Sequence, residues 1–278
     1  MKDTIRGLIA PHAPTMLEDE MDRKASAVNI KLQEIGKELL DWGIEAVVAV
    51  STHWQTESFL VDDADFHRTV TDYYGFRREI EYDVAGKPEL ARQLLAAGEK
   101  NLVYPAAAQH GVDHAITIPL HFMFPEKNIP VIPVSVAGSA LSAFRWGRIL
   151  GHTLRQWGGK TLLLVSGSLS HDLMAFMTGR RRDEYKAFDR QVMKLLAAGN
   201  GMDLLNMDSR LVAAAKPEGA FRDLYMLLGA MGSQSRGRVA AYENLPGVGL
   251  GVIEFAEAAY AETEEEWLAA SPASSGIH

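Results

Sequence analysis

Residues 47–54 read Val47-Val48-Ala49-Val50-Ser51-Thr52-His53-Trp54. A run of small and β-branched apolar residues without a charge is typical of a strand that is buried on both faces of a sheet. The run stops at two hydroxyl residues and a histidine. Because ligands bind at the carboxyl ends of such strands in α/β proteins, we interpret His53 as a candidate functional residue.

The same arrangement occurs twice more along the chain. The apolar run 5–10 leads into Pro11-His12-Ala13-Pro14, and the run 162–165 leads into Ser166-Gly167-Ser168-Leu169-Ser170-His171. The carboxyl ends of parallel strands lie at one edge of their sheet. We therefore expect three histidines that are far apart in the sequence, His12, His53 and His171, to converge.

Helical and strand patterns alternate through most of the chain. Apolar residues recur at helical spacing in residues 25–40, 87–98, 144–157, 183–198 and 221–231, and further strands are expected at residues 58–62, 129–136, 239–243 and 252–255. This alternation is typical of a three-layer α/β/α protein with a central, mostly parallel sheet. We expect a single domain over residues 1–260, followed by an acidic, serine-rich tail over residues 261–278 without stable structure.

Composition excludes several classes of function. The net charge of −8 argues against a nucleic-acid-binding protein, which needs a clustered basic face. No apolar run reaches the roughly 20 residues that a membrane span needs, and the first residues lack the apolar stretch of a secretory signal. We therefore expect a cytoplasmic protein that does not bind membranes. Because the chain has no cysteine, a metal ion must be held by histidine, aspartate or glutamate.

Nine histidines are present, and most histidines in proteins are structural or merely exposed. Four of them lie in loops or at strand ends beside small or hydroxyl residues: His12, His53, His114 and His171. Glu243 is a carboxylate at the end of an apolar stretch, although taken alone it is equally typical of an exposed acid. Two histidines and one carboxylate on one face of Fe(II) would leave three positions open for a substrate and O₂.

Two familiar motifs are excluded. Residues 246–251 contain three glycines at alternating positions, but no helix is expected after them, so a dinucleotide-binding loop is not indicated. Residues 167–171 have histidine where the nucleophile elbow of a hydrolase needs glycine. Tyr73, Tyr74 and Arg78 are pocket candidates by their aromatic and basic context, and a surface helix explains them equally well.

Several short motifs occur in a fairly specific order between residues 5 and 255. They are Pro11-His12-Ala13-Pro14-Thr15-Met16, Glu34-Ile35-Gly36-Lys37, Ser51-Thr52-His53-Trp54, Asp113-His114, Gly167-Ser168-Leu169-Ser170-His171, Phe188-Asp189-Arg190-Gln191, Met226-Leu227-Leu228-Gly229 and residues 243–251. In these motifs the chain resembles the class III extradiol ring-cleavage dioxygenases of the LigB-like superfamily. It is most similar to the homoprotocatechuate and aminophenol dioxygenase branches.

This resemblance implies a function and a set of site residues. Carried over by position, the metal ligands are His12, His53 and Glu243, the catalytic acid/base is His171, and His114 lines the substrate pocket. The implied cofactor is Fe(II), with O₂ as the second substrate and a catechol or a 2-aminophenol as the first. His171 would accept a proton from the substrate and return it during ring cleavage. The resemblance also implies a homo-oligomer.

Two alternatives remain open. One is an enzyme of the same fold that uses Zn(II), as DOPA-dioxygenase-like proteins do, or Mn(II). The other is a non-catalytic subunit of the MEMO-like kind. Such a subunit would be expected to lose one of His12, His53 and Glu243, and this chain retains all three.

Overall fold

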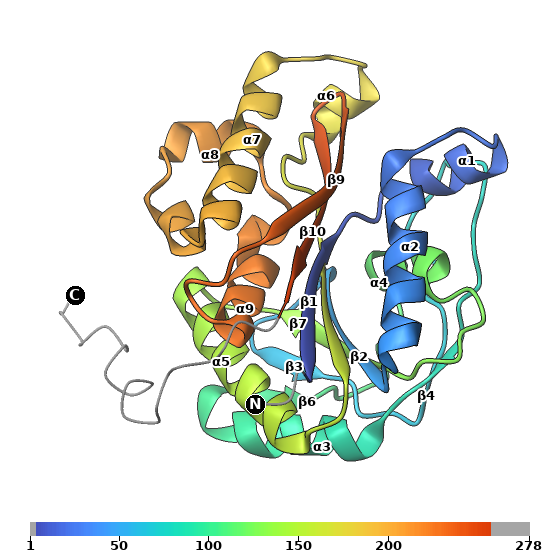
Figure 1. Ribbon diagram of the computed structural model, residues 1–278, viewed down its shortest axis with the longest axis vertical. Helices are drawn as coiled ribbons and strands as arrows, with labels where there is room; N and C mark the ends of the chain where they lie inside the picture. The colour runs from blue at the N-terminus through green and yellow to red at the C-terminus, as the bar shows by residue number, and fades with distance from the viewer. Residues whose placement is uncertain (1–3, 257–278) are drawn as a thin grey trace.

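A computed structural model describes residues 4–256 of the chain as a central eight-stranded sheet with helices on both faces (Figure 1). The predicted fold class, a three-layer α/β/α protein with a mostly parallel sheet, is confirmed. The predicted tail at residues 261–278 lies outside the described residues.

The large sheet has the strand order β6-β3-β7-β2-β8-β1-β10-β9. Its strands are β1 (Ile5–Ala10), β2 (Ala46–Gln55), β3 (Phe59–Val61), β6 (Val103–Pro105), β7 (Val131–Val136), β8 (Thr161–Ser166), β9 (Arg238–Leu245) and β10 (Val248–Phe255), while β4 (Phe66–His67) and β5 (Val84–Ala85) form a separate pair. The four central strands β7, β2, β8 and β1 are parallel, so their carboxyl ends lie at one edge.

Helices cover both faces of the sheet. They are α1 (Thr15–Met21), α2 (Ala27–Trp42), α3 (Pro88–Gly98), α4 (His114–Met123), α5 (Ala140–Trp157), α6 (Leu173–Met177), α7 (Asp183–Ala198), α8 (Ser209–Ala215) and α9 (Arg222–Met231), with short 3₁₀ helices η1 (Glu99–Asn101), η2 (Gly201–Asn206) and η3 (Glu218–Phe221). Along β2, Val47 and Ala49 pack in the cluster that includes α2 and α4, whereas Val48 and Val50 pack in the cluster that includes α5 and α9. Both faces of β2 are therefore buried, as its uncharged sequence predicts.

The glycine-containing segment 246–251 lies mostly in strand β10. Only Pro246 and Gly247 turn the chain, with Gly247 at φ +73°, and β10 begins at Val248. A Cβ atom on Gly249 would lie 2.1 Å from Oδ2 of Asp189 on α7. Glycine is therefore needed in this strand for close packing, and its usual meaning as a loop residue does not apply.

The apolar segment that contains Pro119 forms helix α4. Asp113 caps this helix, because its side chain accepts a hydrogen bond from the backbone N–H of Ile116. Pro119 removes only one backbone donor, so the helix continues through it to Met123. The cap places His114 in the first turn of α4.

Helices α5 and α9 pack unusually closely. A Cβ atom on Gly147 would lie 2.0 Å from the backbone oxygen of Met226, and one on Gly229 would lie 2.1 Å from that of Phe144. Neither backbone can move without shifting a whole helix, so these two glycines determine how near the helices approach.

We expect Gly147→Ala to lower the free energy of unfolding by about 1–3 kcal/mol, because overpacking outweighs the better helix propensity of alanine. Denaturant unfolding followed by circular dichroism measures this change. Gln156→Ala on the exposed side of α5 is the control, with a change within about 0.5 kcal/mol. A more stable Gly147→Ala protein would contradict the close packing.

Candidate functional site

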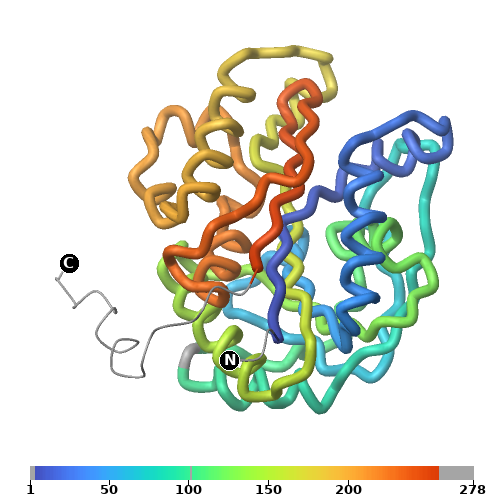
Figure 2. The backbone as a smooth tube through the Cα atoms, viewed as in Figure 1, coloured from blue at the N-terminus to red at the C-terminus, as the bar shows by residue number. Residues whose placement is uncertain are grey.

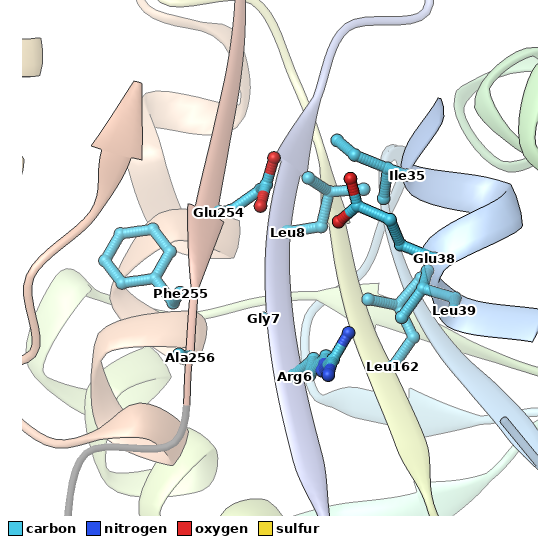
Figure 3. Close-up of a pocket in the computed structure, with 10 residues that line it drawn as sticks. All are labelled: Arg6, Gly7, Leu8, Ile35, Glu38, Leu39, Leu162, Glu254, Phe255 and Ala256. Carbon is cyan, nitrogen blue, oxygen red and sulfur yellow. The ribbon is translucent and has the colours of Figure 1, made fainter. Parts of the chain in front are cut away.

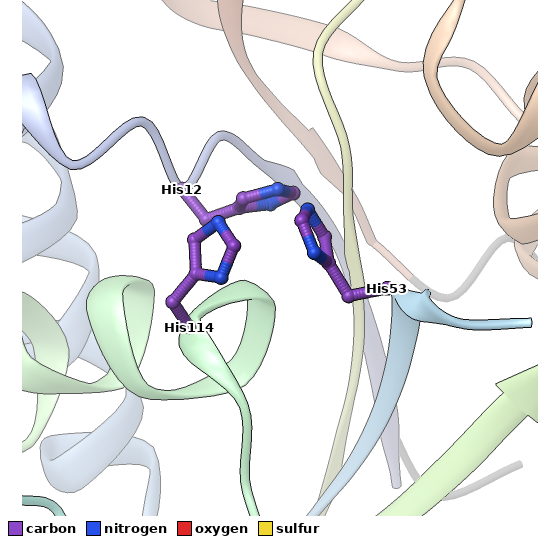
Figure 4. A group of neighbouring side chains, drawn as sticks. All are labelled: His12, His53 and His114. Atoms are coloured by element: carbon purple, nitrogen blue, oxygen red, sulfur yellow. The ribbon is translucent and has the colours of Figure 1, made fainter. Parts of the chain in front are cut away.

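Three histidines meet at the carboxyl edge of the sheet (Figure 4). His12 follows β1, His53 lies near the end of β2, and His114 begins α4. One ligand nitrogen from each ring lies within 4.8 Å of the others. The ring centroids are 5.1 Å apart for His12 and His53 and 4.0 Å apart for His53 and His114. The sequence predicted that His12 and His53 would converge, and the structure brings His114 to the same place.

The hydrogen bonds of Ser166 favour one tautomer of the buried His12 ring. The Ser166 hydroxyl donates its hydrogen to the carbonyl oxygen of Ala10 at 3.2 Å. It can therefore only accept from Nδ1 of His12, which lies 2.9 Å away. Burial lowers the pKa of His12, although Glu218 opposes this effect. The neutral ring then carries its hydrogen on Nδ1 and presents a lone pair at Nε2.

Asp72 orients the other two rings. Its Oδ2 lies 3.0 Å from Nδ1 of His53, and its Oδ1 lies 2.6 Å from Nδ1 of His114. Burial raises the pKa of Asp72, but the hydrogen bonds from His114 and His53 lower it well below its usual range. An ionised carboxylate that fixes Nδ1–H of a histidine leaves Nε2 as the ligand atom, which is the usual arrangement behind metal-bound histidines.

Glu218 is the carboxylate beside the histidines. It begins η3, where Gly219, Ala220 and Phe221 all have left-handed backbones, with φ of 58°, 53° and 59°. Two of these are not glycine, and such strain persists where surrounding packing enforces it, often at functional sites. The backbone N–H of Ser168 donates to Oε2 of Glu218 at 2.8 Å. The turn and this bond aim Oε1 at the histidines.

Oε1 of Glu218 lies 2.9 Å from Nε2 of His12 and 3.2 Å from Nε2 of His53. Burial raises the pKa of Glu218, but His12 and His53 hold it well below its usual range. Burial likewise lowers the pKa of His53, but the hydrogen bonds with Asp72 and Glu218 outweigh this and raise it to about 10. The two carboxylates thus favour positive charge at the histidines, and a bound metal cation could take the place of the proton on His53.

These distances fit a divalent metal ion. With metal–ligand bonds of about 2.1 Å, neighbouring ligand atoms at right angles lie about 3 Å apart. In the tautomer with hydrogen on Nδ1, Nε2 of His12 and Oε1 of Glu218 are two acceptors facing each other at 2.9 Å. A cation bound by both would remove their repulsion. The two histidines and Glu218 therefore have the chemistry and the spacing of a metal site.

The structure places Glu243 away from the histidine group, so its surroundings favour Glu218 over the Glu243 that the resemblance implies, and the ligand set itself stays a prediction. Oε1 of Glu243 accepts from the Ser26 hydroxyl at 3.0 Å and from the backbone N–H of Val28 at 3.3 Å. Both donors belong to the beginning of α2, where a negative charge is favourable. The hairpin register pairs Glu243 with Leu250, so its side chain serves α2 and is not among the histidine group.

His171 approaches the same site from the segment after β8. Its Nε2 lies 3.9 Å from Oε2 of Glu218, and its side chain is 25% exposed. Ser170 next to it donates to Oδ2 of the buried Asp189 at 3.1 Å, and Tyr242 donates to the same oxygen at 2.7 Å. Burial raises the pKa of Asp189 to about 6. This network fixes the backbone that carries His171.

A cavity of about 210 Å³ lies over these groups, and all four histidines line it. Tyr73 and Tyr74 also line it, as the sequence suggested, whereas Arg78 instead forms an ion pair with Glu20. A second cavity of about 140 Å³ lies beside Gly7 at the beginning of β1 and has no histidine in its lining (Figure 3). The first cavity is therefore the candidate substrate site.

Two of the site residues were missed by sequence reasoning. Glu218 lies in an aperiodic Pro217-Glu218-Gly219 turn between helices, and Asp72 lies in the irregular stretch 65–82. A glutamate between proline and glycine was the available signal for Glu218, and it is weak. For Asp72, only its position beside Tyr73 and Tyr74 pointed to a pocket.

Comparison with known proteins gives the family. A family model described as the catalytic LigB subunit of aromatic ring-opening dioxygenase matches residues 6–253. The chain belongs to the LigB family. This chain is 28% identical over 246 residues to 3,4-dihydroxyphenylacetate 2,3-dioxygenase of Escherichia coli. The match covers 80% of this chain and 87% of that relative. The predicted class of enzyme, an extradiol ring-cleaving dioxygenase, is confirmed.

Two further similarities are more limited. This chain is 31% identical over 133 residues to 4,5-DOPA dioxygenase extradiol of Beta vulgaris, but the match covers 46% of this chain and 49% of that relative. The crystal structure of an uncharacterized protein from Escherichia coli K12 superposes with a TM-score of 0.70 over 90% of this chain and 98% of that one, at 19% identity, which shows the fold alone. Within residues 4–256, no helix is both long and apolar enough to cross a membrane.

Proposed function

We propose that this protein holds Fe(II) through His12, His53 and Glu218 and cleaves the ring of a catechol-type or 2-aminophenol-type substrate with O₂. The observation that carries this proposal is the position of one glutamate oxygen, 2.9 Å and 3.2 Å from the two histidine Nε2 atoms. When bound, Fe(II) supplies adjacent positions for the two heteroatoms of the substrate and for O₂.

The remaining histidines act on the substrate in this proposal. His171 lines the cavity and is partly exposed, so its imidazole can accept a proton from a substrate hydroxyl and return it during ring cleavage. His114 is oriented by Asp72 and offers its other ring nitrogen to a substrate oxygen. Asp72 itself stays ionised between the two rings that it orients and does not exchange a proton.

A second candidate is a Zn(II) enzyme of the same fold, with Mn(II) as a further alternative metal. The observation that favours Zn(II) is the third histidine, because one nitrogen each of His12, His53 and His114 could surround one ion. Three histidines and an open fourth position are a common catalytic zinc site. The homo-oligomer expected from the sequence stays a prediction.

The metal and the reaction can be tested together. The protein is purified without oxygen, freed of metal with a chelator, and reloaded with Fe(II), Mn(II) or Zn(II). With catechol or 2-aminophenol in air, we expect the Fe(II) form to consume one O₂ per substrate and to form a coloured ring-opened product. The metal-free protein is the matched control, because it has the same side chains without an ion. Turnover by the Zn(II) form alone would favour the second candidate.

A further inference from the structure

The cavity is divided by chemistry into two parts. The four histidines and Asp72 lie together and form a polar end, and apart from Thr15 and Ser168 the other lining side chains are apolar or aromatic. The apolar part includes Tyr73, Phe76, Leu173, Phe176 and Leu245. If the two adjacent oxygens of a catechol lie at the polar end, a substituent on the ring must lie against the apolar part.

No lysine or arginine is among the described residues that line the cavity. Four of the cations near the lining residues along the chain bind elsewhere, while Arg180 is exposed and is not part of the lining. Arg77 pairs with Asp22 at 2.7 Å, Arg78 with Glu20 at 2.6 Å, and Lys216 with Asp172 at 3.0 Å; Arg181 donates to the carbonyl oxygen of Asn244 at 3.4 Å. A carboxylate on the substrate would therefore find no cationic partner in the cavity lining.

An ammonium group on the substituent would also lack a free partner of opposite charge. The one carboxylate in the cavity lining is Asp72, and each of its oxygens already accepts from a histidine. Apolar surface, in contrast, is available and unused. Leu173 is 53% exposed and Tyr74 is 78% exposed, although both line the cavity. An apolar substituent would cover such surface, which is favourable in water.

We infer that the substrate is a catechol whose ring substituent is uncharged and apolar, such as an alkyl or aryl group, and that Leu173 and Phe176 of α6 select for it. This inference rests on the proposed function. It gives this protein a different substrate preference from its relatives named for 3,4-dihydroxyphenylacetate and DOPA, whose ring substituents are charged.

The first test measures binding apart from turnover. The Fe(II)-loaded protein is titrated without oxygen with catechol, 4-ethylcatechol, 4-butylcatechol and 3,4-dihydroxyphenylacetate, and kcat/KM for each is then measured in air. We expect affinity and kcat/KM to rise by up to about fourfold per added methylene group. We expect the acid to be at least about tenfold poorer than 4-ethylcatechol in both measurements.

These measurements test ring cleavage and the preference for an apolar substituent separately. Absence of ring cleavage with every catechol would overturn the proposed function, while the order of the anaerobic affinities would still decide the inference. Tighter binding of the acid, or a higher kcat/KM for it, would overturn the inference and leave ring cleavage standing. Equal values across the alkyl series would also overturn it, because the apolar wall would then contribute nothing.

The second test places a positive charge among the apolar residues that line the cavity, at Leu173. Leu173→Arg is expected to raise kcat/KM for 3,4-dihydroxyphenylacetate at least about tenfold and to lower it for 4-butylcatechol. Met174→Arg is the matched control, since Met174 is the next residue of α6, is 66% exposed and does not line the cavity. An equal effect of both variants would mean that general surface charge, and not the wall at Leu173, selects the substrate.

Discussion

Glu218→Ala is expected to lose stoichiometric Fe(II), whereas Glu243→Ala is expected to retain it. Glu218 is buried and its Oε1 faces both His12 and His53, so the variant removes one of three proposed ligand atoms. Outer-shell partners of metal ligands already contribute about 10- to 100-fold to affinity, so losing a ligand should weaken binding by at least about a hundredfold. Iron per chain after anaerobic desalting measures the difference.

Glu243→Ala is the control for a glutamate with a structural role. It removes the acceptor of two hydrogen bonds at the beginning of α2. We expect it to lower the free energy of unfolding by about 0.5–2 kcal/mol, as loss of a helix cap does, and to keep its iron. Loss of iron in Glu243→Ala, with normal iron in Glu218→Ala, would restore the ligand set implied by the resemblance.

His171→Phe is expected to keep its iron and to bind a catechol, yet to turn over about a hundred- to ten-thousand-fold more slowly. Phenylalanine fills a similar volume but can neither accept nor donate a proton. The His171 side chain lies in the cavity and approaches Oε2 of Glu218, not the Oε1 that faces His12 and His53. The replacement therefore leaves the two proposed ligand histidines in place. Single-turnover kinetics after anaerobic loading separate binding from the chemical step.

The matched control for this variant is His152→Phe, which makes the same replacement at an exposed position of α5. It should behave as the unmodified enzyme. Loss of iron in His171→Phe would make His171 a ligand. Turnover near the normal rate would instead assign the proton transfer to His114, whose ring nitrogen is the other one available to the substrate.

The parts of the fold that follow from local pattern could be predicted from the sequence. The apolar runs that became β1, β2 and β8 predicted buried strands, and the carboxyl ends of parallel strands lie at one edge of a sheet. This reasoning brought His12 and His53 together correctly. Helix ends were less accurate: α5 begins at Ala140 because Ser139 and Ser142 form a capping box, and the apolar pattern does not report this.

The carboxylate could not be predicted, because its position depends on the path of the backbone. Glu218 reaches the histidines through three successive left-handed residues, a conformation that no periodic pattern indicates. Glu243 was assigned from resemblance, but the register of the β9–β10 hairpin directs it to the beginning of α2. A shift of a single residue in that register would have pointed its side chain to the other face.

The place of β1 in the middle of the sheet has a consequence for how the enzyme is made. In Figure 2 the first strand lies between segments from much later in the chain, and it pairs Ile5 with Thr161 on β8 and Gly7 with Phe255 on β10. Contacts between such distant residues close large loops and form slowly. A growing chain on the ribosome therefore cannot enclose β1 until β10 has been synthesised. His12, which follows β1, then reaches its final surroundings late, so the proposed metal site is completed only near the end of folding.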